Sequence, residues 1–164
     1  MLPQELEKYL YEHIPLSRAM QISVLEIGEQ SVILGAPLAP NINHRETAFG
    51  GSVSALAILS AWSLLYTRLS QNRLSARLII QRNSMDYLLP IHGGFTARSS
   101  LTQPDQWPQF VRMLTRKSKA RLSVSAVLEH AGDVVGRFSG DFVALGQGTE
   151  LNLPDQPAEA RKHP

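Results

Sequence analysis

The stretch from Asn41 to Leu69, NINHRETAFGGSVSALAILSAWSLLYTRL, constrains the fold more than any other part of the chain. Its first part is polar. From Val53 to Leu69 the apolar residues occupy most of the circumference of a helix rather than one stripe, and such a helix is buried nearly all round. Its serines and Arg68 keep the apolar run below the roughly 20 residues that a membrane span needs. We therefore predict a helix wrapped by protein, and no membrane span.

The composition limits what can wrap this helix. With 164 residues, of which 43% are hydrophobic and 18% charged, the chain fits one globular domain with a sizeable core. Apolar periodicity runs through residues 1–145 and is lost in residues 146–164. We therefore predict a single domain followed by a mobile tail.

The chain contains no cysteine. This excludes disulfides, thiolate metal sites and a cysteine nucleophile. Near the N-terminus, Glu5, Glu7 and Glu12 stand where a signal peptide would be basic and then apolar. Together these features predict a cytoplasmic protein.

The order of periodic segments predicts an α+β fold. Helical spacing covers residues 3–13 and the long apolar segment, and residues 102–119 suit a short helix or an irregular excursion. The predicted strands are residues 22–27, 32–38, 74–88, 95–101, 121–129 and 134–145. Strands and helices do not alternate as in a parallel sheet. An antiparallel sheet buries one long helix only by curling around it, so we predict a curled sheet of about six strands.

The start of the long helix is a candidate anion site. Gly50 and Gly51 precede Ser52, so bulky side chains do not shield the N–H groups of the first turn. The alternative is that the glycines only permit a tight turn and that Ser52 caps the helix.

A second candidate is a basic segment. The formal net charge is +2, and positive residues gather at Arg112, Arg116, Lys117, Lys119 and Arg121. This segment could face an anion. Nucleic acid is the less favoured partner, because only 7% of residues are aromatic and no nucleic-acid-reading motif accompanies the segment.

The order of the elements resembles the hotdog fold, and two motifs extend the resemblance. Residues 43–52 read NHRETAFGGS at the start of the buried helix, and residues 86–95 read DYLLPIHGGF. The chain resembles the thioesterase-type family that is also found fused behind acetyltransferase domains in some bacteria. The resemblance covers residues 2–145 and implies a hotdog fold and thioester chemistry.

The resemblance also implies a site. In related hotdog thioesterases an asparagine precedes a His-Gly-Gly at the helix start, and the N–H of the first glycine polarises the thioester carbonyl. By that similarity Asn43 and Gly50 take these catalytic roles. The neighbours that would contact the substrate are Thr47, Phe49, Gly51 and Ser52, and cationic Arg116, Lys117 and Lys119 would hold its phosphates.

Two positions depart from the pattern of those relatives. Phe49 stands in place of the histidine, and Ile58 stands in place of the acid that follows the glycine by eight residues. Asp86 and His44 are the candidates for the missing base. Each has an alternative role, because Asp86 could bind backbone N–H groups and a loop histidine such as His44 is often simply solvated.

Two other kinds of active site, that of a serine hydrolase and that of a zinc deaminase, do not match the sequence. Ser54 stands where a serine-hydrolase elbow requires its second glycine. His44-Arg45-Glu46 matches part of the zinc-deaminase motif, but the cysteine ligands of that motif are absent. We expect neither a metal nor a cofactor.

Three functions remain open. The first is hydrolysis of acyl thioesters of CoA or acyl carrier protein, in fatty acid metabolism. The second is an acyl-binding hotdog protein without hydrolysis, which Ile58 favours. The third is a dehydratase-like hotdog, for which Ile58 again occupies the place of the acid. A curled sheet leaves edges that a two-fold partner would extend, so we predict a homodimer, or a tetramer built from it.

Overall fold

A computed structural model describes residues 1–146, so residues 147–164 of the predicted tail lie outside the described residues. The helices are α1 (Pro3–His13), α2 (Pro15–Ala19), α3 (Gly50–Gln71) and α4 (Trp107–Lys117). The strands are β1 (Ser23–Ile27), β2 (Ser31–Ala36), β3 (Ala76–Tyr87), β4 (Phe95–Leu101), β5 (Lys119–His130) and β6 (Asp133–Gly146). Two 3₁₀ turns are η1 (Ala39–Asn41) and η2 (Pro104–Gln106).

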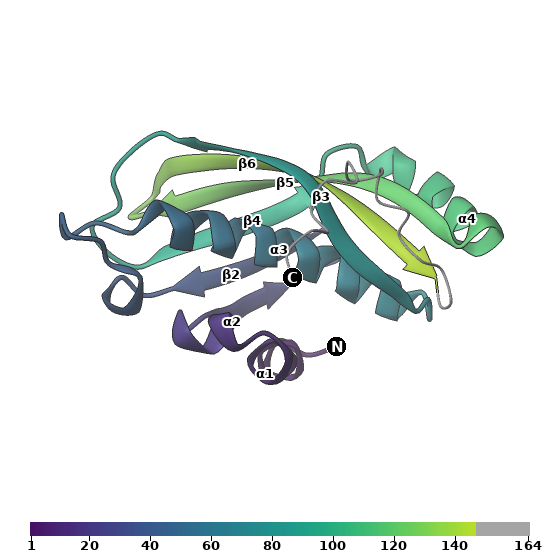
Figure 1. Ribbon diagram of the computed structural model, residues 1–164, viewed down its shortest axis with the longest axis horizontal. Helices are drawn as coiled ribbons and strands as arrows, with labels where there is room; N and C mark the ends of the chain where they lie inside the picture. The colour runs from purple at the N-terminus through teal and green to yellow at the C-terminus, as the bar shows by residue number, and fades with distance from the viewer. Residues whose placement is uncertain (147–164) are drawn as a thin grey trace, which may run out of the picture.

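The strands form one six-stranded sheet in the order β1-β2-β4-β5-β6-β3. All neighbouring pairs are antiparallel. The sheet curls along α3, which runs the length of its inner face (Figure 1). The predicted fold class is confirmed: this is the hotdog arrangement of a curled antiparallel sheet around one long helix.

The core lies between α3 and the sheet. Leu56, Leu64 and Leu65 are fully buried, and hydroxyl groups join the helix to the strands. Ser60 Oγ lies 3.0 Å from the carbonyl oxygen of Ala97 and 3.2 Å from that of Val32. A buried hydroxyl group that keeps its hydrogen bonds costs little, which explains how Ser60 is tolerated in a buried helix.

α3 was predicted to be buried nearly all round, and the structure departs from this along one stripe. A stripe along the helix stays half-buried, because the sheet of one chain covers only part of its circumference. The members of this stripe are Ala55, Ile58, Trp62 and Tyr66. α3 is long and apolar enough to cross a membrane, but 61% of its most apolar window is buried within the fold.

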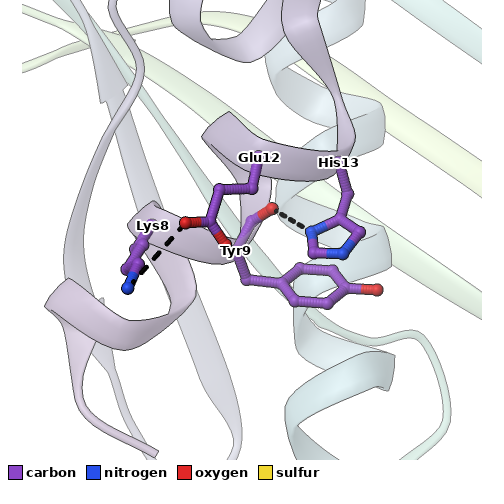
Figure 2. A network of polar contacts seen from close by, with 4 residues as sticks. All are labelled: Lys8, Tyr9, Glu12 and His13. Carbon is purple, nitrogen blue, oxygen red and sulfur yellow. Dashed lines mark hydrogen bonds and ion pairs between the residues drawn. The ribbon is translucent and has the colours of Figure 1, made fainter.

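Helix α1 contributes aromatic contacts to this stripe. The Tyr9 ring stacks on Trp62 and Tyr66, with centroids 6.1 and 4.8 Å apart, and burial raises the pKa of the Tyr66 hydroxyl. Figure 2 shows polar contacts within α1, where His13 Nδ1 donates to the Tyr9 carbonyl oxygen at 2.9 Å and Lys8 pairs with Glu12 at 3.8 Å. Exposed pairs of this kind contribute little to stability, so α1 is held mainly by its packing.

The two edges of the sheet differ. β1 has only five residues and a bulge, and Glu7 of α1 accepts a hydrogen bond from the Val24 N–H at 2.9 Å. β3 has twelve residues, most of them exposed, and within residues 1–146 it pairs on one side only, with β6. The open edge of this sheet is therefore β3.

Two details differ from the prediction, and one open alternative is decided. α2 was not predicted, and of the two alternatives for residues 102–119 the structure has the short helix, α4, preceded by η2. α3 begins at Gly50 with Phe49 as its N-cap, so Ser52 lies inside the first turn and does not cap it. Pro15 explains α2, because proline is favoured in the first turn of a new helix.

Candidate active site at the start of α3

The first turn of α3 offers free backbone donors. Phe49 is extended, with φ −65° and ψ 129°, and its side chain makes no capping hydrogen bond. The first N–H to find an acceptor is that of Val53, which donates to the Phe49 carbonyl oxygen at 3.1 Å. Within residues 1–146, the N–H groups of Gly50, Gly51 and Ser52 have no acceptor. A helix start of this kind attracts a negatively charged oxygen.

The loop before α3 is held by Asn43. Its Oδ1 accepts from the N–H of Arg45 at 2.8 Å and of Thr47 at 3.3 Å, while its Nδ2 donates to Thr47 Oγ1 at 3.0 Å and to the Ala48 carbonyl oxygen at 3.4 Å. The side chain therefore organises the loop, as asparagine does in many turns. His44, in the same loop, is exposed.

A pocket of about 380 Å³ opens beside the helix start. Gly50 forms part of its wall, together with the end of β3 and the loop that follows. The other residues of the wall are Ala48, Val53, Tyr87, Leu88, Leu89, Pro90, Ile91 and Val135. The wall is apolar apart from the Tyr87 hydroxyl and the backbone, which suits an acyl group next to a polarised carbonyl.

Exposed apolar side chains surround this pocket. Phe49 is 57% exposed, and Tyr87, Leu88 and Leu89 are each at least half exposed. The Phe49 ring lies where a Cβ on Gly51 would be, with Cε1 only 2.3 Å from that position. Gly51 is therefore required for the Phe49 ring to lie against the helix start.

Asp86 lies on the opposite side of the sheet from this pocket. Successive residues of a strand face opposite sides, and Met85 packs against the core while Tyr87 lines the pocket. Asp86 therefore faces the outer side, where its register partner is Arg137 of β6. Within one chain the structure does not bring Asp86, His44 and Gly50 together.

Sequence reasoning overlooked Tyr87. The Tyr87 hydroxyl donates to the Gly50 carbonyl oxygen at 3.0 Å, so the end of β3 is tied to the first turn of α3. The alternation along β3 was the available signal, because it places Tyr87 and Asp86 on different faces.

The basic segment lies at the other end of the molecule. α4 packs near the C-terminal end of α3, where the Arg68 guanidinium carbon is 4.4 Å from the centroid of the Trp107 ring. Along 22 residues α3 rises by about 30 Å. Figure 1 shows α4 at the opposite end from the start of α3. One chain therefore does not bring Arg116, Lys117 or Lys119 to the Gly50 pocket.

Among residues 1–146 no three side chains of histidine, cysteine, aspartate or glutamate gather in a way that could hold a metal ion.

Solved structures share this architecture. A protein of unknown function from Chlorobaculum tepidum is 25% identical, with 88% of this chain and 94% of that chain covered and a TM-score of 0.83. A "putative thioesterase" from Shewanella oneidensis is 25% identical, with coverage of 87% and 96% and a TM-score of 0.75. A Pseudomonas aeruginosa protein described as a "Probable Thioesterase" is 22% identical, with coverage of 88% and 97% and a TM-score of 0.74, and it supports the fold alone.

A family model described as "Putative thioesterase (yiiD_Cterm)" matches residues 3–146. This range contains the whole sheet, α3 and every residue of the pocket wall. The chain therefore has the hotdog fold and belongs to the family described as "Putative thioesterase (yiiD_Cterm)".

Proposed function

We propose that the protein hydrolyses acyl thioesters carried by CoA or by acyl carrier protein, at the pocket beside Gly50. The observation that carries the proposal has two parts. Within residues 1–146 the N–H groups of the first turn of α3 have no acceptor, and the first of these residues, Gly50, forms part of the wall of an apolar pocket. Preorganised backbone donors stabilise the oxyanion that forms when a thioester carbonyl is attacked.

The reaction needs only one water molecule besides the thioester. The water oxygen adds to the carbonyl carbon, and the carbonyl oxygen becomes an oxyanion close to the Gly50 N–H. The carbon–sulfur bond then breaks with its electron pair on sulfur, and the proton lost by the water ends on that sulfur. The products are a carboxylic acid and a thiol.

The predicted phosphate-binding residues require a second copy of the chain. β3 presents an open edge of twelve residues, and a two-fold partner would add its own β3 in the antiparallel direction. That pairing reverses the partner strand, so its Ala76 end approaches Tyr87 of the first copy. Lys119 lies in the same cross-strand row as Leu145 and Arg77. In the partner, Lys119 on β5 is separated from the shared β3 edge by β6. The partner's Lys119 would therefore lie two strand spacings, about 10 Å, from the partner's β3.

The mass of the particle tests the dimer. Multi-angle light scattering at micromolar concentration should give twice the 18.1 kDa of the chain. A particle of 18.1 kDa would remove both the dimer and the assignment of Lys119, Arg116 and Lys117 to the substrate.

A thiol-release assay tests the hydrolysis. Acyl-CoA substrates of increasing chain length, and the matching acyl carrier protein substrates, are incubated with the full chain, and free thiol is measured with a thiol reagent. The protein contributes no background because it has no cysteine. We expect thiol release that saturates with substrate. No release with any chain length or carrier would overturn the proposal.

That negative outcome would favour the second candidate, an acyl-binding protein without hydrolysis. One observation supports it, which is that no carboxylate or histidine belongs to the pocket wall. Binding without turnover, measured by calorimetry with the same thioesters, would establish it.

A cytoplasmic location stays a prediction from the cysteine-free composition.

A further inference from the structure

The Gly50 pocket contains one side chain able to bind water. Of its nine wall residues, only Tyr87 carries a hydrogen-bonding atom on its side chain. Asn43, His44 and Asp86, the residues that the sequence suggested, do not belong to the wall. A water molecule in this pocket therefore has the Tyr87 hydroxyl and the backbone as its polar neighbours.

The hydrogen bond of Tyr87 decides what its hydroxyl can do. A phenol carries one proton to donate and lone pairs to accept. The proton is donated to the Gly50 carbonyl oxygen at 3.0 Å, so the hydroxyl oxygen remains as an acceptor. A water that donates a proton to this oxygen has a lone pair free to attack a carbonyl carbon held at the helix start.

The same hydrogen bond acts on the backbone. The Gly50 carbonyl belongs to the peptide unit whose N–H is that of Gly51, one of the donors without an acceptor in residues 1–146. A hydrogen bond accepted by a peptide carbonyl polarises the unit and strengthens its N–H as a donor. Tyr87 would thus strengthen the N–H group that binds the thioester carbonyl oxygen, in addition to holding the water.

Tyr87 is held firmly enough for this role. It is the last residue of β3, opposite Gly136, and the next N–H, that of Leu88, donates to the Val135 carbonyl oxygen at 2.9 Å. Its ring lies against Gly50, with Cε1 3.4 Å from the position of an added Cβ. The hydroxyl therefore has a fixed place beside the first turn of α3.

We propose that Tyr87 is the residue that positions the attacking water. This inference rests on the proposed thioester hydrolysis. The Tyr87 hydroxyl keeps its proton throughout, accepts a hydrogen bond from the water, and releases it when the water oxygen bonds to the carbonyl carbon. The electron pair of the carbon–sulfur bond and the proton of the water leave with the thiol.

Tyr87→Phe tests this proposal, because it removes the hydroxyl and keeps the ring. We expect kcat for thiol release to fall about 10- to 100-fold, as for the loss of one transition-state hydrogen bond. KM should stay within about twofold, because the acyl pocket is unchanged. A purely structural role would lower the melting temperature and leave the kcat of the folded fraction intact.

Tyr11→Phe is the matched control. It also removes a tyrosine hydroxyl that donates to a backbone carbonyl, that of Ile22 at 2.8 Å, and Tyr11 does not belong to the pocket wall. It should leave kcat unchanged.

The outcomes separate the role of Tyr87 from the proposed hydrolysis. Wild-type turnover with a Tyr87→Phe kcat equal to that of Tyr11→Phe would overturn the role of Tyr87 and leave the proposed hydrolysis standing. A rise in KM at constant kcat would also overturn it, in favour of simple substrate contact. Absence of wild-type turnover with every thioester would overturn both.

Discussion

Replacing Gly50 by alanine tests whether the backbone at the start of α3 meets the substrate. Gly50 is the first residue of the helix. Among residues 1–146 only Gly132 is a glycine with positive φ, so Gly50 does not need glycine for its conformation. A Cβ at Gly50 would lie 3.4 Å from Tyr87 Cε1 and 3.7 Å from its hydroxyl oxygen, which is ordinary contact. The fold therefore accepts alanine at this position.

The structure sets the size of the stability effect. Glycine replaced by alanine at a compatible backbone position stabilises a protein by about 0.4–1 kcal/mol, because the unfolded chain loses freedom. For a domain of this size the melting temperature should rise by about 1–4 °C. The added methyl group would project beside the Gly50 N–H, where the thioester carbonyl must approach. We expect turnover to fall about 10- to 100-fold while stability increases.

Gly132→Ala provides the control for this measurement. Gly132 has φ +87° and nothing within 4 Å of an added Cβ, so alanine there is strained without any clash. It should lose about 1 kcal/mol of stability and keep its turnover. Melting temperature and thiol release are measured on the same preparations. Full specific activity in Gly50→Ala would refute the assignment of this backbone to the oxyanion.

Four further substitutions, at three positions, test the loop, the start of α3 and the basic segment. Asn43→Asp keeps the acceptor for the N–H groups of Arg45 and Thr47, whereas Asn43→Ala removes it, so melting should show the alanine variant to be less stable by about 1 kcal/mol or more. Gly51→Ala would put a Cβ 2.3 Å from Phe49 Cε1, so the exposed ring should turn outward at little cost in stability, detected by near-ultraviolet circular dichroism. Lys119→Ala should raise KM for acyl-CoA severalfold at unchanged kcat, and an unchanged KM would remove Lys119 from the phosphate contacts.

The fold followed from local signals in the sequence. The apolar run after Val53 predicted the central helix. The alternation of apolar and polar residues, together with the turn residues, predicted all six strands to within about two residues at each end. These signals are strong because burial imposes a period on the sequence. α2 was missed because five residues are too few to show a period.

The site residues were predicted less well than the fold. Their roles depend on which face of a strand or helix each side chain occupies and on which residue of another element it contacts. The glycines at the helix start were identified from their lack of side chains. Asn43 was found through a resemblance, and the structure gives its side chain four hydrogen bonds within the loop. The contact between Tyr87 and Gly50 joins residues 37 positions apart, which no local pattern encodes.

The remaining prediction decides between a carboxylate base and a water held by a neutral side chain. Asp86 faces the outer side of β3, with Arg137 opposite, while the pocket lies on the inner side. If Asp86 removed a proton from water, turnover would show an acidic limb that Asp86→Asn abolishes. Since the structure puts the sheet between them, we expect Asp86→Asn to leave the pH profile unchanged from about pH 5 to 8 and kcat within about twofold. The profile is measured with one acyl-CoA in buffers of constant ionic strength, with wild type alongside. An acidic limb that disappears in Asp86→Asn, in a variant with an unchanged melting temperature, would return the role of base to Asp86 and would require this carboxylate to reach the pocket of a second copy.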